Sequence, residues 1–359
     1  MKILRLTTLL DFGGQEKQYI SFTDNPELLQ KEYVFAAIGH GGHAEQVLRK
    51  RGFEVHILNR NYSIRNLSNI IALYRLIRKV KPDIVHTAAA EANLQGIIAA
   101  KLAGVKTIIG EEIGLPNNHS HLARIIFKII YSFASHIIAV SQKVKSTLIE
   151  IGEAKESKIE IIYNPVSAPI EYESKEHKDF NWVFVSRLIP RKNTITLIEA
   201  FSRLPIDRRG VLTIVGDGPE RKFLESRVAE LSLEKSVYFK GFQPEPEIFI
   251  NEADVFVLPA FDEGFGIVVI EAMLQKKACL CGFGGGIPEY LIDNLNGWFF
   301  NPYSVEDLCE KMEEILSKDK KEIISIGEKA FEMANEKFSV SRYIENIENF
   351  YQSIYDRKK

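Results

Sequence analysis

The chain has 359 residues and a formal net charge of -2; 45% of its residues are hydrophobic and 26% are charged. Because this length exceeds what one hydrophobic core usually supports, two domains are expected. The near-neutral charge gives no sign of nucleic-acid binding, and the hydrophobic content is ordinary for a globular protein.

Cysteine usage and the first residues bear on the cellular compartment. Cys279, Cys281 and Cys309 have no CxxC spacing, and the first two lie in an apolar, strand-like run. Buried thiols are therefore expected rather than a disulfide or a metal site. The chain begins directly with a strand pattern, which leaves no room for a signal peptide, and no stretch approaches about 18 uncharged apolar residues. We expect a cytoplasmic protein.

The first half alternates short apolar runs with segments of helical periodicity, which predicts a doubly wound parallel sheet with right-handed crossovers. The expected strands are 3–9, 33–38, 53–58, 84–87, 107–109, 136–140 and 159–162, and the expected helices are 15–22, 44–51, 67–80, 92–103, 122–133 and 143–151. The pattern breaks at Asn164-Pro165-Val166, and the polar run 171–179 is the best candidate for a domain linker.

The second half repeats this alternation. Its expected strands are 182–186, 211–215, 237–239, 254–258 and 278–281, and its expected helices are 194–203, 220–231, 245–251, 266–274, 305–317, 320–337 and 340–357. We therefore expect two doubly wound α/β domains that share a cleft. In such sheets, ligands bind at the carboxyl ends of the strands, near a topological switch point.

The segment 261–272, FDEGFGIVVIEA, follows an apolar run and opens into helical spacing. Glu263 and Glu271 bracket a glycine-containing turn and a helix N-terminus. That terminus suits a phosphate because its first N–H groups lack partners and carry partial positive charge. If the turn is partly helical, eight residues span roughly 12 Å, enough for one carboxylate on each side of a diphosphate. A strand–turn–helix scaffold with two solvated glutamates explains the segment equally well on its own.

Two basic residues stand near the start of the second domain. Arg187 ends a predicted strand, and Lys192 stands just before a predicted helix. A guanidinium fork and a compact ammonium together suit a diphosphate. A basic helix start is the structural alternative, but positive charge at this position opposes the helix dipole, which favours the functional interpretation.

Glycine-containing turns follow several predicted strands. Gly216 lies in a VGDGPE junction that lacks the third glycine of the dinucleotide fingerprint, which disfavours a nicotinamide-dependent oxidoreductase. Phe242, after the next strand, is a weak candidate to contact a base ring. The loop 283–289, FGGGIPE, and the Gly13-Gly14 pair permit close approach of the backbone to a ligand. A tight turn or a flexible loop is the structural alternative for these glycines.

Arg187 with Lys192, the GDGP turn, the EGFGIVVIEA segment and the GGIPE loop together resemble the family-4 group of retaining glycosyltransferases, which have the GT-B fold. The resemblance covers nearly the whole chain. It implies two Rossmann-like domains, 1–165 on the acceptor side and 166–338 on the donor side, with a helix at 339–359 that crosses back to the first domain. It also implies a UDP-linked nucleotide-sugar as co-substrate, with no metal and no other cofactor, because Arg and Lys replace the cation.

The resemblance assigns roles to individual residues. Glu263 would contact the donor sugar beneath the reacting ring, and Glu271 would hold the ribose hydroxyls. Arg187 and Lys192 would bind the diphosphate and stabilise its developing charge. The other implied donor contacts are the backbone at Gly264, Phe265, Gly266 and Ile267, the base-side residues Gly216 and Phe242, and Gly14 from the first domain.

One region departs from the family pattern. A histidine that contacts the donor sugar usually follows the fifth strand, whereas the segment 110–115 reads GEEIGL. Glu112 is expected to replace it, and His119 or His121 to compensate from the following loop. This substitution bears on which sugar the pocket accepts.

The sequence contains fewer signals for the residues that bind the acceptor. His86, Glu91 and Asn93 follow a strand end as candidates to contact acceptor or sugar, although His86 is equally well explained as a structural residue. The segment 122–131 is amphipathic and basic; we favour a helix packed on the sheet over contact with a membrane surface. A glycan or lipid-linked acceptor, at the inner face of a membrane, is implied by the family alone.

We therefore expect a retaining, hexosyltransferase-type enzyme of cell-surface polysaccharide or glycolipid synthesis. Attack from the face that the nucleotide leaves, with a departing phosphate oxygen as base, is favoured over a covalent glycosyl-enzyme because no nucleophile is evident. One alternative is a nucleotide-sugar epimerase or hydrolase on the same fold, which would consume donor without acceptor. The other is a non-catalytic nucleotide-sugar-binding partner, which should have lost Lys192 or one glutamate.

Overall fold

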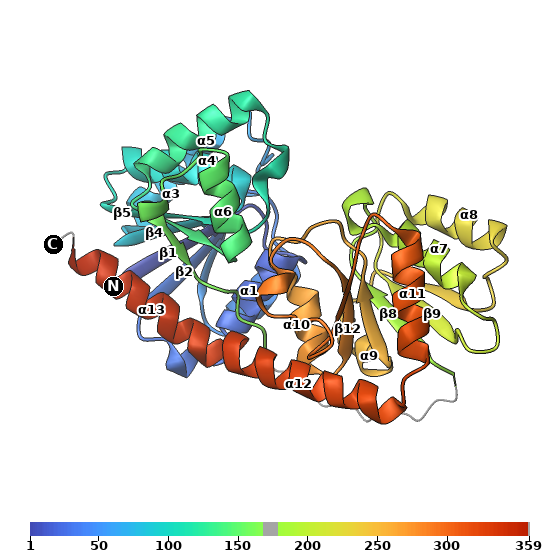
Figure 1. Cartoon of the computed structure of the whole chain (residues 1–359). Helices are drawn as coiled ribbons and strands as arrows, with labels where there is room; N and C mark the ends of the chain where they lie inside the picture. The colour runs from blue at the N-terminus through green and yellow to red at the C-terminus, as the bar shows by residue number, and fades with distance from the viewer. Residues whose placement is uncertain (168–178, 358–359) are drawn as a thin grey trace. The chain divides into compact units, whose positions relative to one another are not determined.

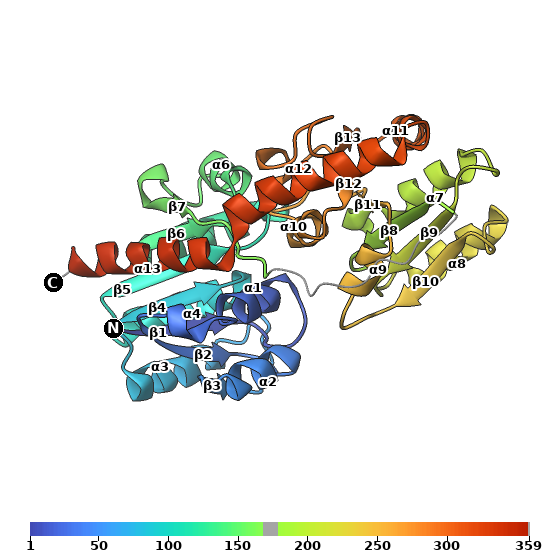
Figure 2. The same ribbon diagram turned by 90° about the horizontal axis from the view of Figure 1, so that it is seen from below.

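The computed structural model describes residues 1–167 and 179–357, and the chain divides into two compact units. Unit 1 comprises Met1–Ser167 together with Phe338–Lys359, and unit 2 comprises Ala168–Lys337. Each unit is built around a parallel sheet with helices on both faces (Figures 1 and 2). The expected linker run 171–179 lies, apart from Asp179, outside the described residues.

In the described part of unit 1, seven parallel strands are ordered β3-β2-β1-β4-β5-β6-β7. The chain winds outward from β1 in one direction and then from β4 in the other, so the topological switch point lies between β1 and β4. The strands are β1 (Lys2–Thr7), β2 (Glu32–Ala37), β3 (Glu54–Ile57), β4 (Ile84–Ala88), β5 (Thr107–Glu112), β6 (His136–Ala139) and β7 (Ile159–Ile161). The helices are α1 (Gly14–Phe22), α2 (His43–Lys50), α3 (Ser68–Val80), α4 (Ala90–Leu102), α5 (His121–Phe133) and α6 (Gln142–Glu150).

In the described part of unit 2, six parallel strands are ordered β10-β9-β8-β11-β12-β13, so that the switch point lies between β8 and β11. The strands are β8 (Asn181–Val185), β9 (Val211–Val215), β10 (Val237–Gly241), β11 (Val255–Leu258), β12 (Ala278–Gly282) and β13 (Trp298–Phe300). The helices are α7 (Thr194–Arg203), α8 (Arg221–Glu230), α9 (Glu247–Asn251), α10 (Ile267–Leu274), α11 (Val305–Leu316) and α12 (Lys320–Phe338). All residues of β11 and β12 are buried, as expected for strands covered on both faces.

The last described helix, α13 (Val340–Asp356), belongs to unit 1. Its buried side chains recur at helical spacing, and Tyr343, Ile347 and Tyr351 join the same hydrophobic core as Tyr19 and Phe22. The rings of Phe22 and Tyr343 meet edge to face with centroids 5.6 Å apart. The predicted return of the last helix to the first domain is therefore confirmed.

Apart from shifts of one or two residues at the ends of elements, three details differ from the sequence predictions. β13 was missed because a three-residue strand has too little length to show a pattern. β5 continues to Glu112 instead of ending at residue 109, and Gly110, Glu111 and Glu112 are buried within the strand. The turn 261–266 is not helical; α10 begins only at Ile267.

Cys279 and Cys281 lie on β12 as free, buried thiols, which confirms the prediction for them. Burial raises the pKa of both thiols. Within residues 1–167 and 179–357, no helix has the length and apolar character needed to cross a membrane.

Candidate active site

The loops that follow β8 and β11 meet at the switch point of unit 2. The backbone N–H of Phe261 donates to the carbonyl of Arg191 (3.2 Å), and the Asn193 side-chain amide donates to the carbonyls of Pro259 (3.1 Å) and Pro302 (2.8 Å). Asn193 is buried in a left-handed conformation (φ 56°), which asparagine tolerates better than most residues. It holds the loops together and was missed as a positioning residue, although an asparagine directly before a helix is a recognisable turn signal.

These loops bring Lys192 and Glu263 into a direct ion pair. Lys192 ends a single 3-10 turn, Pro190–Lys192, and only 13% of its side chain and 11% of that of Glu263 are exposed. Burial lowers the pKa of Lys192 to about 8, and the Arg191 guanidinium acts in the same direction. The carboxylate of Glu263 favours the charged ammonium, so Lys192 is a cation at neutral pH.

Further positive charge surrounds this pair. Arg187 is exposed on the loop that follows β8, and its field, like that of Arg191, lowers the pKa of Lys192. Asp262 provides opposing negative charge. A cluster of two guanidiniums and one ammonium at a strand edge has the donors that a diphosphate requires.

Gly216 shapes the loop that carries Arg187. It has φ 131°, and a Cβ atom there would lie 1.8 Å from the carbonyl oxygen of Ser186. The Leu188 N–H then donates to the Asp217 carbonyl (3.0 Å), which ties the two loops together. The glycine of the GDGP turn is thus explained by close backbone packing, the structural alternative considered from the sequence.

The loop that carries Glu263 leads directly into the N-terminus of α10. Gly266 caps it in a left-handed conformation (φ 81°), and the buried Tyr290 hydroxyl donates to the Phe265 carbonyl (2.7 Å). The first N–H groups of a helix have no partner within the helix, which leaves this terminus suited to an anion. Glu271, half-buried, stands in the second turn of α10.

The glycine loop after β12 packs against the backbone of Glu263. The Gly286 N–H donates to the Glu263 carbonyl (2.8 Å). Gly285 has φ 64°, and a Cβ atom there would lie 1.9 Å from the same carbonyl oxygen. These glycines therefore let one loop backbone lie directly against another. Phe242, expected near a base, is 53% exposed just after β10.

In unit 1, Glu112 lies at the end of β5, 7% exposed, and accepts a hydrogen bond from the Tyr131 hydroxyl (2.7 Å). Burial raises the pKa of Glu112 to about 7. The His119 Nδ1 atom lies 2.7 Å from Glu153 Oε1, and the charges of both residues act on Glu112. The structure thus brings Glu112 and His119 into one titratable cluster. His121 is the exposed first residue of α5.

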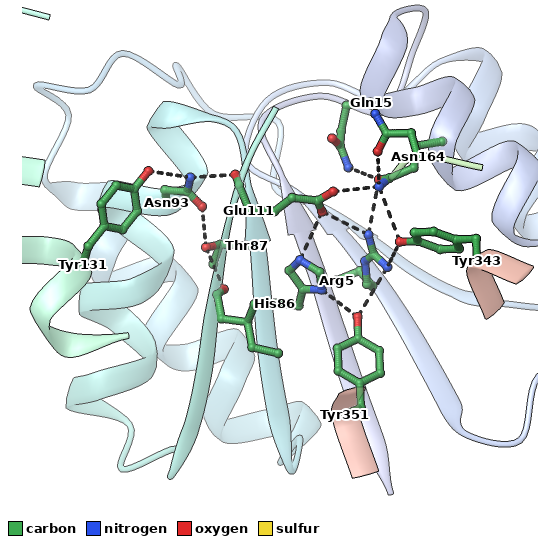
Figure 3. A network of polar contacts seen from close by, with 12 residues as sticks. Arg5, Gln15, His86, Thr87, Asn93, Glu111, Tyr131, Asn164, Tyr343 and Tyr351 are labelled. Carbon is green, nitrogen blue, oxygen red and sulfur yellow. Dashed lines mark hydrogen bonds and ion pairs between the residues drawn. The ribbon is translucent and has the colours of Figure 1, made fainter. Parts of the chain in front are cut away.

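His86 belongs to a different, fully buried network (Figure 3). Its Nδ1 atom lies 2.6 Å from the Tyr351 hydroxyl and its Nε2 atom 3.1 Å from Glu111 Oε2. Burial and the neighbouring Arg5 guanidinium lower the pKa of His86 to about 4, so the ring is neutral. A side chain with no exposed surface favours the structural interpretation of His86 over contact with acceptor or sugar.

The remaining candidates of unit 1 are placed as follows. Asn93 is also buried, and its amide donates to the Glu111 carbonyl (2.9 Å) and the Tyr131 hydroxyl (3.2 Å) (Figure 3). Glu91 is half-buried at the switch point, where it accepts from the Thr8 hydroxyl (3.2 Å). Gly14 is the first residue of α1, which follows β1 at the same edge.

Two Rossmann-like parallel-sheet domains, with the last helix returned to the first, define the GT-B class of glycosyltransferase folds. Residues 170–333 match the family described as glycosyl transferases group 1, and residues 32–168 match glycosyltransferase family 4. The chain therefore belongs to the group 1 glycosyltransferases, which confirms the family and the fold expected from the sequence.

Its relatives include named transferases. The Escherichia coli UDP-Gal:alpha-D-GlcNAc-diphosphoundecaprenol alpha-1,3-galactosyltransferase is 28% identical over 69% of this chain and 67% of its own length. The Campylobacter jejuni N,N'-diacetylbacillosaminyl-diphospho-undecaprenol alpha-1,3-N-acetylgalactosaminyltransferase is 25% identical over 91% of this chain and 92% of its own. The structure of Anabaena Alr3699/HepE in complex with UDP and glucose has the same fold, with a TM-score of 0.86, 22% identity and coverage of 98% of this chain and 100% of that one.

Proposed function

We propose that this glycosyltransferase transfers a sugar, with retention, from a UDP-sugar to a hydroxyl of a glycan or lipid-linked acceptor. The observation that carries the proposal is the Lys192–Glu263 pair at the switch point of unit 2, with Arg187 beside it. The UDP-galactose and diphosphoundecaprenol in the name of the E. coli relative support the donor and acceptor classes. The synthesis of cell-surface polysaccharide or glycolipid is the proposed context.

The donor is bound by groups of different chemistry along one sheet edge. Arg187 and Lys192 hold the diphosphate, assisted by the N–H groups of the backbone from Gly264 to Ile267 at the start of α10. Glu271, further along α10, accepts from the ribose hydroxyls. The base lies toward the loops that contain Gly216 and Phe242.

The chemical step breaks the bond between the anomeric carbon and the oxygen of the β-phosphate. Negative charge grows on that oxygen, where Lys192 and Arg187 stabilise it without a metal ion. The acceptor hydroxyl attacks the same face of the sugar, forms the new glycosidic bond, and gives its proton to the departing phosphate oxygen. Glu263 holds sugar hydroxyls and keeps the Lys192 ammonium aligned.

On the acceptor side, Glu112 and His119 are the groups we assign to sugar or acceptor hydroxyls. A carboxyl with a pKa of about 7 is present in both protonation states near neutrality, so it can donate or accept a hydrogen bond. A lipid-linked acceptor would place the reaction at the cytoplasmic face of a membrane.

The test is a panel of nucleotide-sugars, scored by the unfolding temperature of the protein and then by turnover. A UDP-sugar should raise the unfolding temperature more than its GDP and ADP counterparts do, because a ligand that binds only the folded state stabilises it. Donor consumption should depend on added acceptor and persist in EDTA, and the product should keep the anomeric configuration of the donor. No response to any nucleotide-sugar, or consumption at the same rate without acceptor, would contradict the proposal.

A further inference from the structure

The helices α3, α4 and α5 form one layer of unit 1, with α4 packed against both of the others (Figure 1). Together these helices contain six Lys and Arg residues and one acidic residue, the half-buried Glu91, whereas the whole chain has a net charge of -2. Five of the six basic side chains are exposed: Arg75, Arg78, Lys79, Lys101 and Lys128. The outer surface of this layer is therefore strongly positive.

Helix α5 has apolar side chains on both its inner and its outer side. Its inner side chains, Phe127, Ile130 and Tyr131, are buried against the unit. Its outer side has a stripe of exposed apolar residues: Leu122 (67% exposed), Ile125 (44%), Ile126 (37%), Ile129 (52%) and Phe133 (40%). The sequence interpretation of a helix packed on the sheet thus holds for one side only. Large apolar side chains grouped on one exposed face indicate an interaction surface.

Helix α3 and the end of α4 also expose apolar side chains. Ile70, Ile71, Tyr74 and Leu102 line a shallow apolar hollow, in which Ile71 is 57% and Leu102 is 64% exposed. Arg75, Arg78 and Lys79 are exposed along the same helix, and α3 contains no acidic residue. On α5, likewise, Arg124 and Lys128 are the charged residues and both are basic. Apolar and cationic side chains therefore occur together on both helices.

We propose that the outer face of α3, the end of α4 and α5 is a docking surface for an anionic phospholipid bilayer. Exposed apolar side chains enter the boundary between headgroups and acyl chains, while flanking Lys and Arg side chains contact anionic headgroups. A second copy of the same face is disfavoured as occupant, because two strongly positive surfaces repel each other.

The surface also lies close to the acceptor side of the candidate site within unit 1. Leu122, the first residue of the α5 stripe, follows His119 by three positions, at the carboxyl edge of the sheet. Docking would present a lipid-borne hydroxyl to that edge. This inference adds a membrane-docking surface to the acceptor side of the proposed function. It rests on the proposed function only in that the acceptor is lipid-linked.

The test is flotation of the full chain with vesicles of phosphatidylglycerol and phosphatidylcholine in equal parts, compared with phosphatidylcholine alone. The protein should float with the anionic vesicles only, and less at high salt. Leu122→Gln/Ile129→Gln and Arg75→Gln/Arg78→Gln should each weaken binding at least tenfold. Ile206→Gln, at a residue of unit 2 that is 82% exposed, is the matched control and should bind as wild type does.

All variants are also tested for the rise in unfolding temperature with UDP, which reports folding and donor binding separately from membrane docking. Failure to float, with the UDP response intact, overturns the docking proposal and leaves the proposed function standing. Unchanged binding by the α5 variant overturns it as well. A dimer of the wild-type protein that this variant abolishes, without vesicle binding, would assign the face to a second copy instead.

Discussion

Two ion pairs, one in each unit, have opposite surroundings. Arg5 and Glu111 join β1 to β5 across the sheet of unit 1, with 0% and 1% of their side chains exposed. Lys192 and Glu263 join two loops at the carboxyl edge of unit 2 and keep 13% and 11% exposed. Both pairs are covered, but the first is anchored on strands and the second on loops.

The two ion pairs also differ in the side chains that surround them. The Arg5 guanidinium donates to Gln18 (3.2 Å), Tyr343 (3.1 Å) and Tyr351 (3.4 Å) as well as to Glu111 (3.2 Å). These neutral partners hold both terminal nitrogens of the guanidinium, while its Nε atom is buried without a hydrogen-bond partner in the described part of the chain (Figure 3). Lys192 instead has two neighbours of the same charge, Arg191 and Arg187, which lower its pKa. A guanidinium has no acceptor, so neither can take a hydrogen bond from the ammonium. A pair closed by neutral donors and acceptors holds a fold together, whereas a pair crowded by cations at a strand edge is suited to an anionic ligand.

The largest expected effect is on stability, from breaking the closed pair. Glu111→Ala leaves the Arg5 guanidinium buried without its counter-charge, which should lower the free energy of unfolding by about 3–5 kcal/mol. Urea denaturation measures this loss. Glu32→Ala, at an exposed ion pair with Lys2, is the control and should change little.

A double replacement keeps this prediction testable if the single variant fails to fold. Arg5→Met with Glu111→Leu removes both charges together and should recover a large part of the lost stability. Equal stability of wild type and Glu111→Ala would show that the pair does not hold unit 1 together.

Breaking the loop pair should affect turnover instead. In the proposed mechanism Lys192→Ala removes a cation from the departing diphosphate, and loss of one such electrostatic contact should cost on the order of 10²–10³ in kcat. The unfolding midpoint should change far less than in Glu111→Ala. Lys235→Ala, an exposed lysine at the opposite edge of the same sheet, serves as control in a transfer assay. Near-normal turnover of Lys192→Ala would remove Lys192 from the proposed site.

The smallest expected effect is the pH dependence of UDP affinity. The pKa of Lys192 is lowered to about 8, so its ammonium is present below that pH and is lost as the pH rises through it. UDP binding, measured by calorimetry, should therefore weaken above pH 8, by at most about tenfold per pH unit. Lys192→Arg keeps its charge and should give a flatter profile. The same loss of affinity in this variant would assign the titration to another group.

The sequence predicted the fold nearly completely because apolar runs and helical periodicity alternate without interruption in both halves. It could not predict the pairing of Lys192 with Glu263, which are 71 positions apart. Their contact depends on β8 lying beside β11, and the order of strands in a sheet leaves no local signal. Each residue was identified as a site candidate from its own motif, whereas the turn signal of Asn193 does not show that it joins their loops.

The closed network of unit 1 was missed for a related reason. Arg5 stands in an ordinary strand pattern, and Glu111 lies beyond the predicted end of its strand at residue 109; carboxylates seldom occupy a buried strand. Only tertiary packing shows that each is the counter-charge of the other. The sequence likewise could not decide between a structural role and a binding role for His86, because its buried partners come from β5 and α13.

The return of α13 to unit 1 has a consequence for the order of events during synthesis. Arg5 and Tyr351 are separated by 346 positions, so Arg5 leaves the ribosome long before the tyrosines that cover it. Unit 2 lies wholly within Ala168–Lys337 and needs no later segment. The second unit in the sequence can therefore finish folding first, while unit 1 waits with a charged strand still uncovered. A growing chain would then depend on its last helix to protect its first strand.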